Sequence, residues 1–264
     1  MWQIGIRRGE RRLKYMGSKS RIAKYIVPII QEYIDKNNIQ TYWEPFVGGA
    51  NIIDKVKCPR RIGSDKNPYL IALLQRVQSG GWLYPDVSRE LYNEARQAYQ
   101  NNDLSKFTDW QLGNIGFLAS YNGKWFDGGY AKPVYEKTKH GERYRDYYRE
   151  AKQNLMNQAD NLQGIKFYSL DYRKASIPHD EKWVIYADPP YQNTTGFSNA
   201  KDFDYYEFWN IIRMWSQYHI VLVSEQSAPD DFIPIWEQKI SRSLSANNKK
   251  FVTEKLYIYR SGIA

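Results

Sequence analysis

Tyr42-Trp43-Glu44-Pro45-Phe46-Val47-Gly48-Gly49 has the composition of a short buried strand that runs into a tight glycine turn. Before it, apolar residues at helical spacing indicate a helix over Ser20 to Asp35. After it, Asn51 to Val56 has the composition of a helix start, Arg61 to Asp65 that of a second strand, and Tyr69 to Leu74 that of a further helix. This alternation of strands and helices predicts an α/β fold with a parallel sheet.

The strand pattern stops after this region and resumes near residue 165. From about Ser79 to Gly164 the segments are polar, rich in aromatic residues and helical in period, without a convincing strand. An insertion explains this, because 142 residues separate Phe46 from Asp188, whereas three strand-and-helix units need about 60 to 75. We therefore divide the chain at residues 1–78, 79–164 and 165–264, with the four later strands at residues 165–170, 183–187, 219–223 and 255–259. An insertion of this kind emerges at the rim of the sheet, where it is well placed to hold a macromolecular substrate.

The charge balance and the cysteine count bound the class of protein. The chain carries 38 Lys and Arg against 29 Asp and Glu, a formal charge of +9. This favours a polyanionic partner, nucleic acid first, although a basic enzyme without such a partner explains the charge equally well. The single cysteine, Cys58, excludes an internal disulfide and a Cys-rich zinc site. The basic leader, Met1 to Lys14, lacks the apolar stretch of a signal peptide, and no run is long enough to span a bilayer, so we expect a soluble, cytoplasmic protein.

The glycine turn and the strand after it suggest a cofactor site. Gly48 and Gly49 allow a nucleotide-like ligand to approach the backbone closely. Asp65 follows Gly49 by 16 residues at the end of the next strand, where a carboxylate can bind two ribose hydroxyls. Each feature also has a purely structural explanation, a steric turn for the glycines and a helix cap before Asn67 for Asp65. Together they predict a nucleotide-like cofactor without distinguishing a dinucleotide from an adenosyl compound.

Asp188-Pro189-Pro190-Tyr191 follows the predicted strand 183–187 directly. The two prolines fix φ and lack N–H groups, which makes a stiff loop with carbonyls that local secondary structure does not use. Such a loop suits the activation of an amino group on an aromatic ring, because Asp188 and the Pro189 carbonyl can accept its two hydrogens. Tyr191 offers a flat face for stacking on a base, and a base inside a duplex has to be flipped out to reach it.

These motifs, in this order, resemble those of the Dam-like DNA adenine methyltransferases, and the resemblance runs over most of the chain. It implies a Rossmann-like, parallel-rich sheet of the S-adenosylmethionine methyltransferase type, with a mainly helical target-recognition domain inserted at residues 79–164. The tetrad Asp188, Pro189, Pro190 and Tyr191 matches the catalytic motif of the family in full. The residues that the resemblance implies for S-adenosylmethionine are Tyr15, Lys19, Glu44, Phe46, Gly48, Gly49, Asp65, Asp171 and Asp188.

Two further stretches bear on this resemblance. Thr194-Thr195-Gly196-Phe197 is also similar to the group. Ala50 stands where the family often has a further glycine, and because alanine disfavours positive φ we expect the local turn to differ slightly.

Inside the insertion, Ser120-Tyr121-Asn122-Gly123-Lys124 resembles a recognition hairpin of the family whose Tyr-Asn-Gly core enters the DNA, with an ordinary hairpin turn as the alternative. The continuation Lys124-Trp125-Phe126 departs from the family and leaves the recognised sequence open, a GATC-like site among the candidates. Downstream, basic residues alternate with tyrosines, which suits phosphate contact and base stacking, or else a solvated helix face. The residues predicted to bind DNA are Tyr121, Asn122, Lys124, Lys137, Lys139, Arg143, Arg145 and Arg149, with Arg145 and Arg149 expected on one helix face.

The sequence thus predicts a site-specific adenine methyltransferase that acts on double-stranded DNA in a bacterial or phage-infected cell, as in DNA methylation or restriction-modification. Two alternatives stay open: methylation of adenine in RNA or of the cytosine 4-amino group, and a catalytically silent DNA-binding protein on the same fold. The three histidines show no metal-ligand spacing, so no metal is expected, and we infer no obligatory protein partner.

Overall fold

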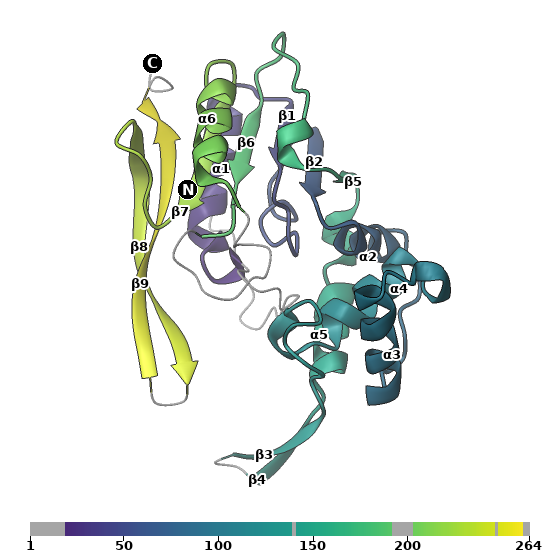
Figure 1. The fold of residues 1–264 in the computed structure, drawn as a ribbon. Helices are drawn as coiled ribbons and strands as arrows, with labels where there is room; N and C mark the ends of the chain where they lie inside the picture. Colours follow the sequence, from purple (N-terminus) through teal and green to yellow (C-terminus); the bar gives the residue numbers. More distant parts are fainter. Residues whose placement is uncertain (1–18, 139–140, 192–202, 246–247, 261–264) are drawn as a thin grey trace. The chain divides into compact units, whose positions relative to one another are not determined.

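The computed structural model describes residues 19–138, 141–191, 203–245 and 248–260 (Figure 1). Its contacts divide the chain into two compact units. The sheet unit comprises Ile22–Val47, Lys55–Lys66 and Gly164–Ala264, and the helical unit comprises Met1–Arg21, Gly48–Asp54 and Asn67–Gln163. The division by function at residues 78 and 164 stays a prediction.

The sheet unit is built on a seven-stranded sheet in the order β5-β2-β1-β6-β7-β9-β8. The first five strands in this order run parallel, and β9 lies antiparallel to both β7 and β8. The bounds are β1 Thr41–Glu44, β2 Arg60–Asp65, β5 Ile165–Ser169, β6 Val184–Ala187, β7 Ile220–Glu225, β8 Phe232–Ser245 and β9 Asn248–Tyr259. The predicted α/β fold with a mostly parallel sheet is therefore confirmed.

The order of the strands creates a switch point between β1 and β6. The chain runs outward from β1 to β2 and β5, returns to β6 beside β1, and then continues to β7 on the other side. In open sheets of this kind ligands bind at the carboxyl ends of the strands beside the switch point. The functional residues are therefore expected after β1 and β6.

The described residues of the sheet unit include two α-helices. In α1 (Ala23–Lys36), Ile26, Ile30 and Ile34 are buried at a spacing of four residues, the period of a helix with one apolar face. The second, α6 (Tyr205–Trp215), begins at Asp204, whose carboxylate accepts a hydrogen bond from the backbone N–H of Glu207 at 2.9 Å. Its buried side chains pack in one apolar cluster with residues of β1, β6 and β7.

The helical unit contains α2 (Pro68–Gln78), α3 (Arg89–Gln100), α4 (Asp109–Gly113) and α5 (Tyr147–Met156). No helix in the described residues is long and apolar enough to cross a membrane. A π-helical turn, Asn114–Leu118, follows α4 directly and is buried throughout. The side chain of Asn114 accepts from the backbone N–H of Tyr84 at 3.1 Å and donates to the hydroxyl of Tyr148 at 3.2 Å. These bonds anchor the turn to the surrounding chain.

A two-stranded hairpin corrects the expectation that the interval 79–164 holds no strand. β3 (Val134–Thr138) and β4 (Gly141–Arg145) pair antiparallel and extend away from the helices of their unit (Figure 1). The hairpin escaped prediction because the period-2 alternation of apolar and polar residues, which reports burial of one face, is absent from these exposed strands. The rest of the interval is mainly helical, as predicted.

Two other expectations are wrong. Asn51 to Lys55 forms turns rather than a helix start, because the chain enters them through Ala50 in a left-handed conformation, with φ 54°. Strand β8 is missing from the prediction, since Pro234 and charged residues obscure its alternation, and β9 begins at Asn248 rather than near residue 255.

Candidate active site

Four acidic residues lie in a row along the carboxyl edge of the sheet. Glu44 ends β1, Asp65 ends β2, Asp188 follows the last residue of β6, and Asp171 lies two residues beyond β5. Because the strand order is β5-β2-β1-β6, the row runs Asp171, Asp65, Glu44, Asp188. Parallel strands end at one edge, so the topology gathers in one place carboxylates that are up to 144 positions apart in sequence. We call these four residues the acidic row.

The end of β1 is held by buried polar contacts. Glu44 is 2% exposed and accepts a hydrogen bond from the Tyr42 hydroxyl at 2.7 Å. Beyond it, the backbone N–H of Val47 donates to the carbonyl of Ser64 on β2 at 2.8 Å. Gly63 permits this approach, because a Cβ there would lie 2.8 Å from a methyl group of Val47. The chain after β1 is thus fixed against β2.

Phe46 contributes an aromatic face to the same edge. Its ring centre lies 4.9 Å from that of Tyr172 and 6.0 Å from that of Phe208, within the range of favourable aromatic pairs. Such a face can support a planar ligand beside the carboxylates of the acidic row.

Asp171 is already engaged by a neighbouring cation. Its carboxylate accepts from the backbone N–H of Arg173 at 3.1 Å and from the guanidinium at 2.5 and 3.0 Å. The Arg173 side chain holds the pKa of Asp171 below its ordinary value, so this carboxylate stays ionised. These contacts engage both carboxylate oxygens, and a contact of Asp171 with a cofactor stays a prediction.

Asp65 does not cap the following helix. The cap of α2 is Asn67, whose side-chain oxygen accepts from the backbone N–H groups of Tyr69 at 3.0 Å and Leu70 at 3.1 Å. The residue that caps α2 is therefore Asn67 rather than Asp65, and the assignment of Asp65 to a ligand stays a prediction.

The loop after β6 is tightly held. Asp188 and Pro190 are half-buried, while Pro189 and Tyr191 are buried. The carbonyl of Pro190 accepts a hydrogen bond from the Tyr205 hydroxyl at 2.7 Å, so this carbonyl is engaged and the Pro189 carbonyl is the better candidate acceptor. The Tyr191 hydroxyl donates to Glu254 on β9 at 2.5 Å.

The glycine turn belongs to the helical unit, where a buried glutamine side chain holds it by hydrogen bonds. Gly48 and Ala50 both have positive φ, 49° and 54°. Ala50 thus adopts the conformation that alanine disfavours. Gln158, which is 2% exposed, donates from its amide to the carbonyls of Gly49 at 3.2 Å and Ala50 at 2.9 Å. This buried amide offsets part of the cost of the left-handed alanine.

Tyr121 and Asn122 lie in a closed loop rather than in a two-residue hairpin. Ser120 and Tyr130 form an isolated antiparallel bridge, and the residues between them turn through Asn122, which has φ 57°. Both Tyr121 and Asn122 are exposed, and Lys124 is half-buried. Tyr121–Gly123 forms a short 3-10 turn, so the ordinary two-residue hairpin turn is not what the structure shows, and a role of this loop in recognition stays a prediction.

The basic residues downstream do not share one helix. Lys137 lies on β3, Arg143 and Arg145 on β4, and Arg149 in the first turn of α5. Arg145 contacts two carboxylates, Glu136 at 3.1 Å and Glu150 at 3.1 Å. The expected common helix face of Arg145 and Arg149 is therefore wrong, and Arg145 ties the hairpin to α5.

Some predicted residues lie outside the described part of the chain. These are Tyr15, Lys139, and Thr194 to Phe197. Lys19 is described, in a short 3-10 turn, and is 9% exposed.

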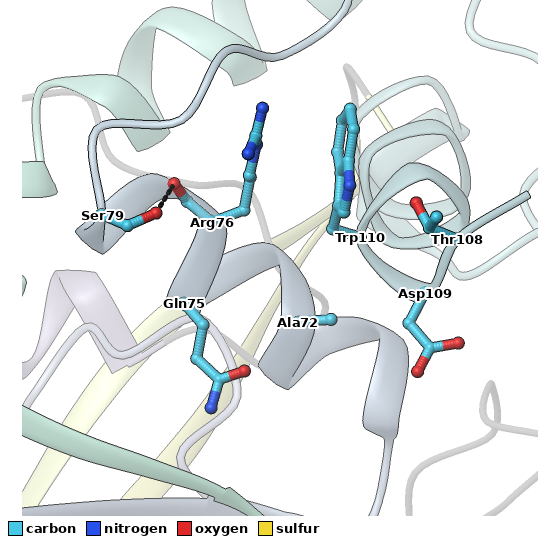
Figure 2. Close-up of a pocket in the computed structure, with 7 residues that line it drawn as sticks. All are labelled: Ala72, Gln75, Arg76, Ser79, Thr108, Asp109 and Trp110. Atoms are coloured by element: carbon cyan, nitrogen blue, oxygen red, sulfur yellow. Dashed lines mark hydrogen bonds between the residues drawn. The ribbon is translucent and has the colours of Figure 1, made fainter.

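A cavity of the helical unit contains none of the predicted site residues. It lies between α2 and the start of α4 and is lined by Ala72, Gln75, Arg76, Ser79, Thr108, Asp109 and Trp110 (Figure 2). In it the Arg76 guanidinium lies over the Trp110 ring, 4.7 Å from its centre. We assign this cavity no part in the candidate active site.

Sequence reasoning missed Glu254, Gln158 and Tyr205. Glu254 could have been noticed in the sequence, since a charged residue at an inward position of a strand is unusual. Gln158 and Tyr205 leave none, because their partners are backbone carbonyls far away in sequence.

Comparison with known proteins gives matches over most of the chain. A family described as D12 class N6 adenine-specific DNA methyltransferase matches residues 15–214. The chain is 28% identical to a DNA adenine methylase of Salmonella typhi, over 84% of this chain and 87% of that protein. It is 27% identical to a DNA adenine methylase of Escherichia coli strain K12, over 83% and 86%. It is 25% identical to the Type II methyltransferase M.MjaIII of Methanocaldococcus jannaschii, over 74% of each.

Proposed function

The chain belongs to the D12 class of N6 adenine-specific DNA methyltransferases, and from this premise we propose that it transfers the methyl group of S-adenosylmethionine to the 6-amino nitrogen of an adenine flipped out of double-stranded DNA at a short specific sequence. The observation that carries the proposal is the position of Asp188-Pro189-Pro190-Tyr191, directly after β6 and beside the switch point.

The acidic row supports S-adenosylmethionine as the cofactor. Its four carboxylates suit a ligand with hydroxyls, an amino group and positive charge, and they repel the phosphates of a dinucleotide. When bound, S-adenosylmethionine supplies an electrophilic methyl group. We assign Asp65 to the ribose hydroxyls, Asp171 to the adenine amino group and Phe46 to the adenine ring. The remaining cofactor residues we propose are Tyr15, Lys19, Glu44, Gly48, Gly49 and Asp188.

The catalytic loop makes the adenine amino group a better nucleophile. Its lone pair is delocalised into the ring, and accepting both hydrogens draws the nitrogen toward tetrahedral geometry. We assign these two acceptors to the Asp188 carboxylate and the Pro189 carbonyl. Tyr191 holds the flipped base by stacking, and the two prolines keep the acceptors in place. The bond from nitrogen to the methyl carbon forms as the bond from that carbon to sulfur breaks, S-adenosylhomocysteine leaves, and one amino proton passes by way of the Asp188 carboxylate to solvent. No covalent bond to the enzyme is needed.

We propose that the insertion, residues 79–164, recognises the target, and that residues 1–78 and 165–264 form the catalytic domain. Asn122 and Tyr121 are exposed in the loop that closes between Ser120 and Tyr130, where they can reach base edges. Contacts with phosphates are assigned to Lys124, Lys137, Lys139, Arg143 and Arg149. We propose that this activity serves DNA in the cytoplasm of a bacterial or phage-infected cell.

Radiolabelled S-adenosylmethionine tests the proposal directly. The purified protein is incubated with label and duplex DNA, with the same sequence as RNA in parallel, and the nucleosides are separated. We expect label only in N6-methyladenine from DNA, and long-read mapping of DNA from expressing cells then gives the sequence context. Label in cytosine or in RNA alone, or cofactor and DNA binding without any transfer, would overturn the proposal.

A further inference from the structure

One hydrogen bond joins the catalytic loop to the antiparallel part of the sheet. The Tyr191 hydroxyl donates to the Glu254 carboxylate with 2.5 Å between the oxygens, across 63 positions of sequence. Tyr191 is 6% exposed and Glu254 is 2% exposed. Both belong to the sheet unit. No role assigned so far includes Glu254.

Glu254 occupies a position where the strand pattern favours an apolar residue. Residues 254, 256 and 258 point to the same face of β9, and Leu256 and Ile258 are buried. A buried carboxylate is costly unless it is hydrogen-bonded, so an apolar residue would be the simpler choice for stability alone. A carboxylate at this position therefore indicates a function for the hydrogen bond that Glu254 accepts from the Tyr191 hydroxyl.

A bond at the hydroxyl restrains the tyrosine ring at its outer end. The ring turns about two side-chain torsions. A fixed hydroxyl oxygen restricts the first, and because a phenolic O–H prefers to lie in the ring plane, a fixed acceptor also favours the value of the second at which the ring plane contains that acceptor. At the inner end, Pro189 and Pro190 stiffen the backbone that carries the ring. We propose that Glu254 is a positioning residue that holds the Tyr191 ring in the plane on which the flipped adenine stacks. This inference rests on the proposed function and deepens it.

The protonation state of the hydroxyl agrees with this task. Burial, with Asp188 and Glu254 nearby, raises the pKa of Tyr191 well above its ordinary value. The hydroxyl therefore stays protonated and keeps donating to Glu254 throughout the pH range of a methylation assay.

A double-mutant cycle tests the proposal, with Glu254→Leu, Tyr191→Phe and the two combined. The readouts are kcat and the fluorescence of 2-aminopurine placed at the mapped target adenine, which reports stacking of the flipped base. We expect Glu254→Leu to lower kcat at least about tenfold, as loss of a bond to a charged group does, and to change the fluorescence of the bound duplex. The dissociation constant of S-adenosylmethionine should stay within about twofold. In the Tyr191→Phe background Glu254→Leu should add less than about twofold, because the bond is already gone.

Matched variants separate positioning from stability. Glu254→Gln keeps an acceptor and should recover most of kcat. Ser224→Ala removes the partner of another buried tyrosine hydroxyl, that of Tyr186, at 2.8 Å, and should leave the 2-aminopurine signal unchanged. If Glu254→Leu does not fold, Glu254→Asp, which draws the carboxylate back by one methylene group, should change the signal in the same direction.

Equal losses of kcat in both backgrounds, or an unchanged 2-aminopurine signal in a folded Glu254 variant that lacks the bond, would overturn the positioning role. Failure of the proposed function looks different, because the wild-type protein would then place no label on adenine.

Discussion

Predicted functional residues lie both at the carboxyl edge of the sheet unit and on the β3–β4 hairpin of the helical unit. The two regions differ in how far their side chains are buried. At the sheet edge Glu44 and Tyr191 are buried, and each has a specific hydrogen-bond partner. On the hairpin Tyr135 is 74% exposed and Tyr144 is 52% exposed, with their rings paired across the strands.

This difference follows from the chemistry proposed for each region. Methyl transfer needs acceptors fixed to within a fraction of an ångström, which only a packed setting provides. Contact with phosphates depends on charge and tolerates mobile side chains. Substitutions at the sheet edge should therefore have large effects at few positions, and substitutions on the hairpin small effects at many.

The largest effect is expected at Asp188. Asp188→Ala should lower methyl transfer at least about a thousandfold, because it removes an acceptor in a water-poor site, while the fold and most DNA binding persist. Asp188→Asn should retain little activity. Rates are measured with radiolabelled cofactor and binding by titration. A transfer rate close to wild type in Asp188→Ala would show that the sheet edge does not hold the catalytic acceptor at Asp188.

Cofactor binding comes next. Gly48→Leu and Asp65→Ala should each weaken S-adenosylmethionine binding at least about tenfold, roughly 1.4 kcal/mol, with little change in DNA affinity. Calorimetry measures this, with Asp180→Ala as the matched control, since Asp180 is exposed and precedes β6 at the other end of the strand. Unchanged cofactor affinity in both variants would remove the assigned pocket.

A smaller effect is expected for base reading in the helical unit. Asn122→Ala should reduce the preference for cognate over scrambled duplex by about fivefold, roughly 1 kcal/mol, because a side-chain amide can bond a base edge. The two duplexes are titrated in parallel. Equal weakening on both would show that Asn122 does not read sequence.

The smallest effect is expected on DNA binding by the hairpin, where two basic residues can be compared. Lys137 is exposed, whereas Arg145 contacts Glu136 and Glu150. Lys137→Gln should lower the salt slope of DNA binding by about one unit, and Arg145→Gln should leave the slope unchanged and loosen the hairpin. Over a fourfold range of salt one unit amounts to about a fourfold difference in affinity. Equal slopes in the two variants would contradict this assignment.

The sequence predicts the parallel strands of the sheet unit well because they are short and apolar, whereas it misses β8 and the first half of β9. The family resemblance is confirmed, and three members of the acidic row, Asp65, Asp171 and Asp188, could be located since each ends or follows a predicted strand. The β3–β4 hairpin could not be predicted, because an exposed ribbon buries no face and so has no period-2 pattern. The contacts of Glu254 and Gln158 join residues more than 60 positions from their partners, which no local pattern reports.

The π-helical turn Asn114–Leu118 sets the rotational phase of everything that follows it. A turn closed by i to i+5 bonds accommodates one residue more than an α-helical turn. If the same residues were all wound as an α-helix, the segment would turn further, and the next residues would rotate by up to about 100° around the axis. Ser120 would then leave its bridge to Tyr130, and Tyr121 and Asn122 would face a different direction. Deleting one residue removes the surplus as α-helical winding returns, so it should leave that direction nearly unchanged. The π-helical turn therefore accommodates one extra residue without changing the direction of the exposed loop that follows it.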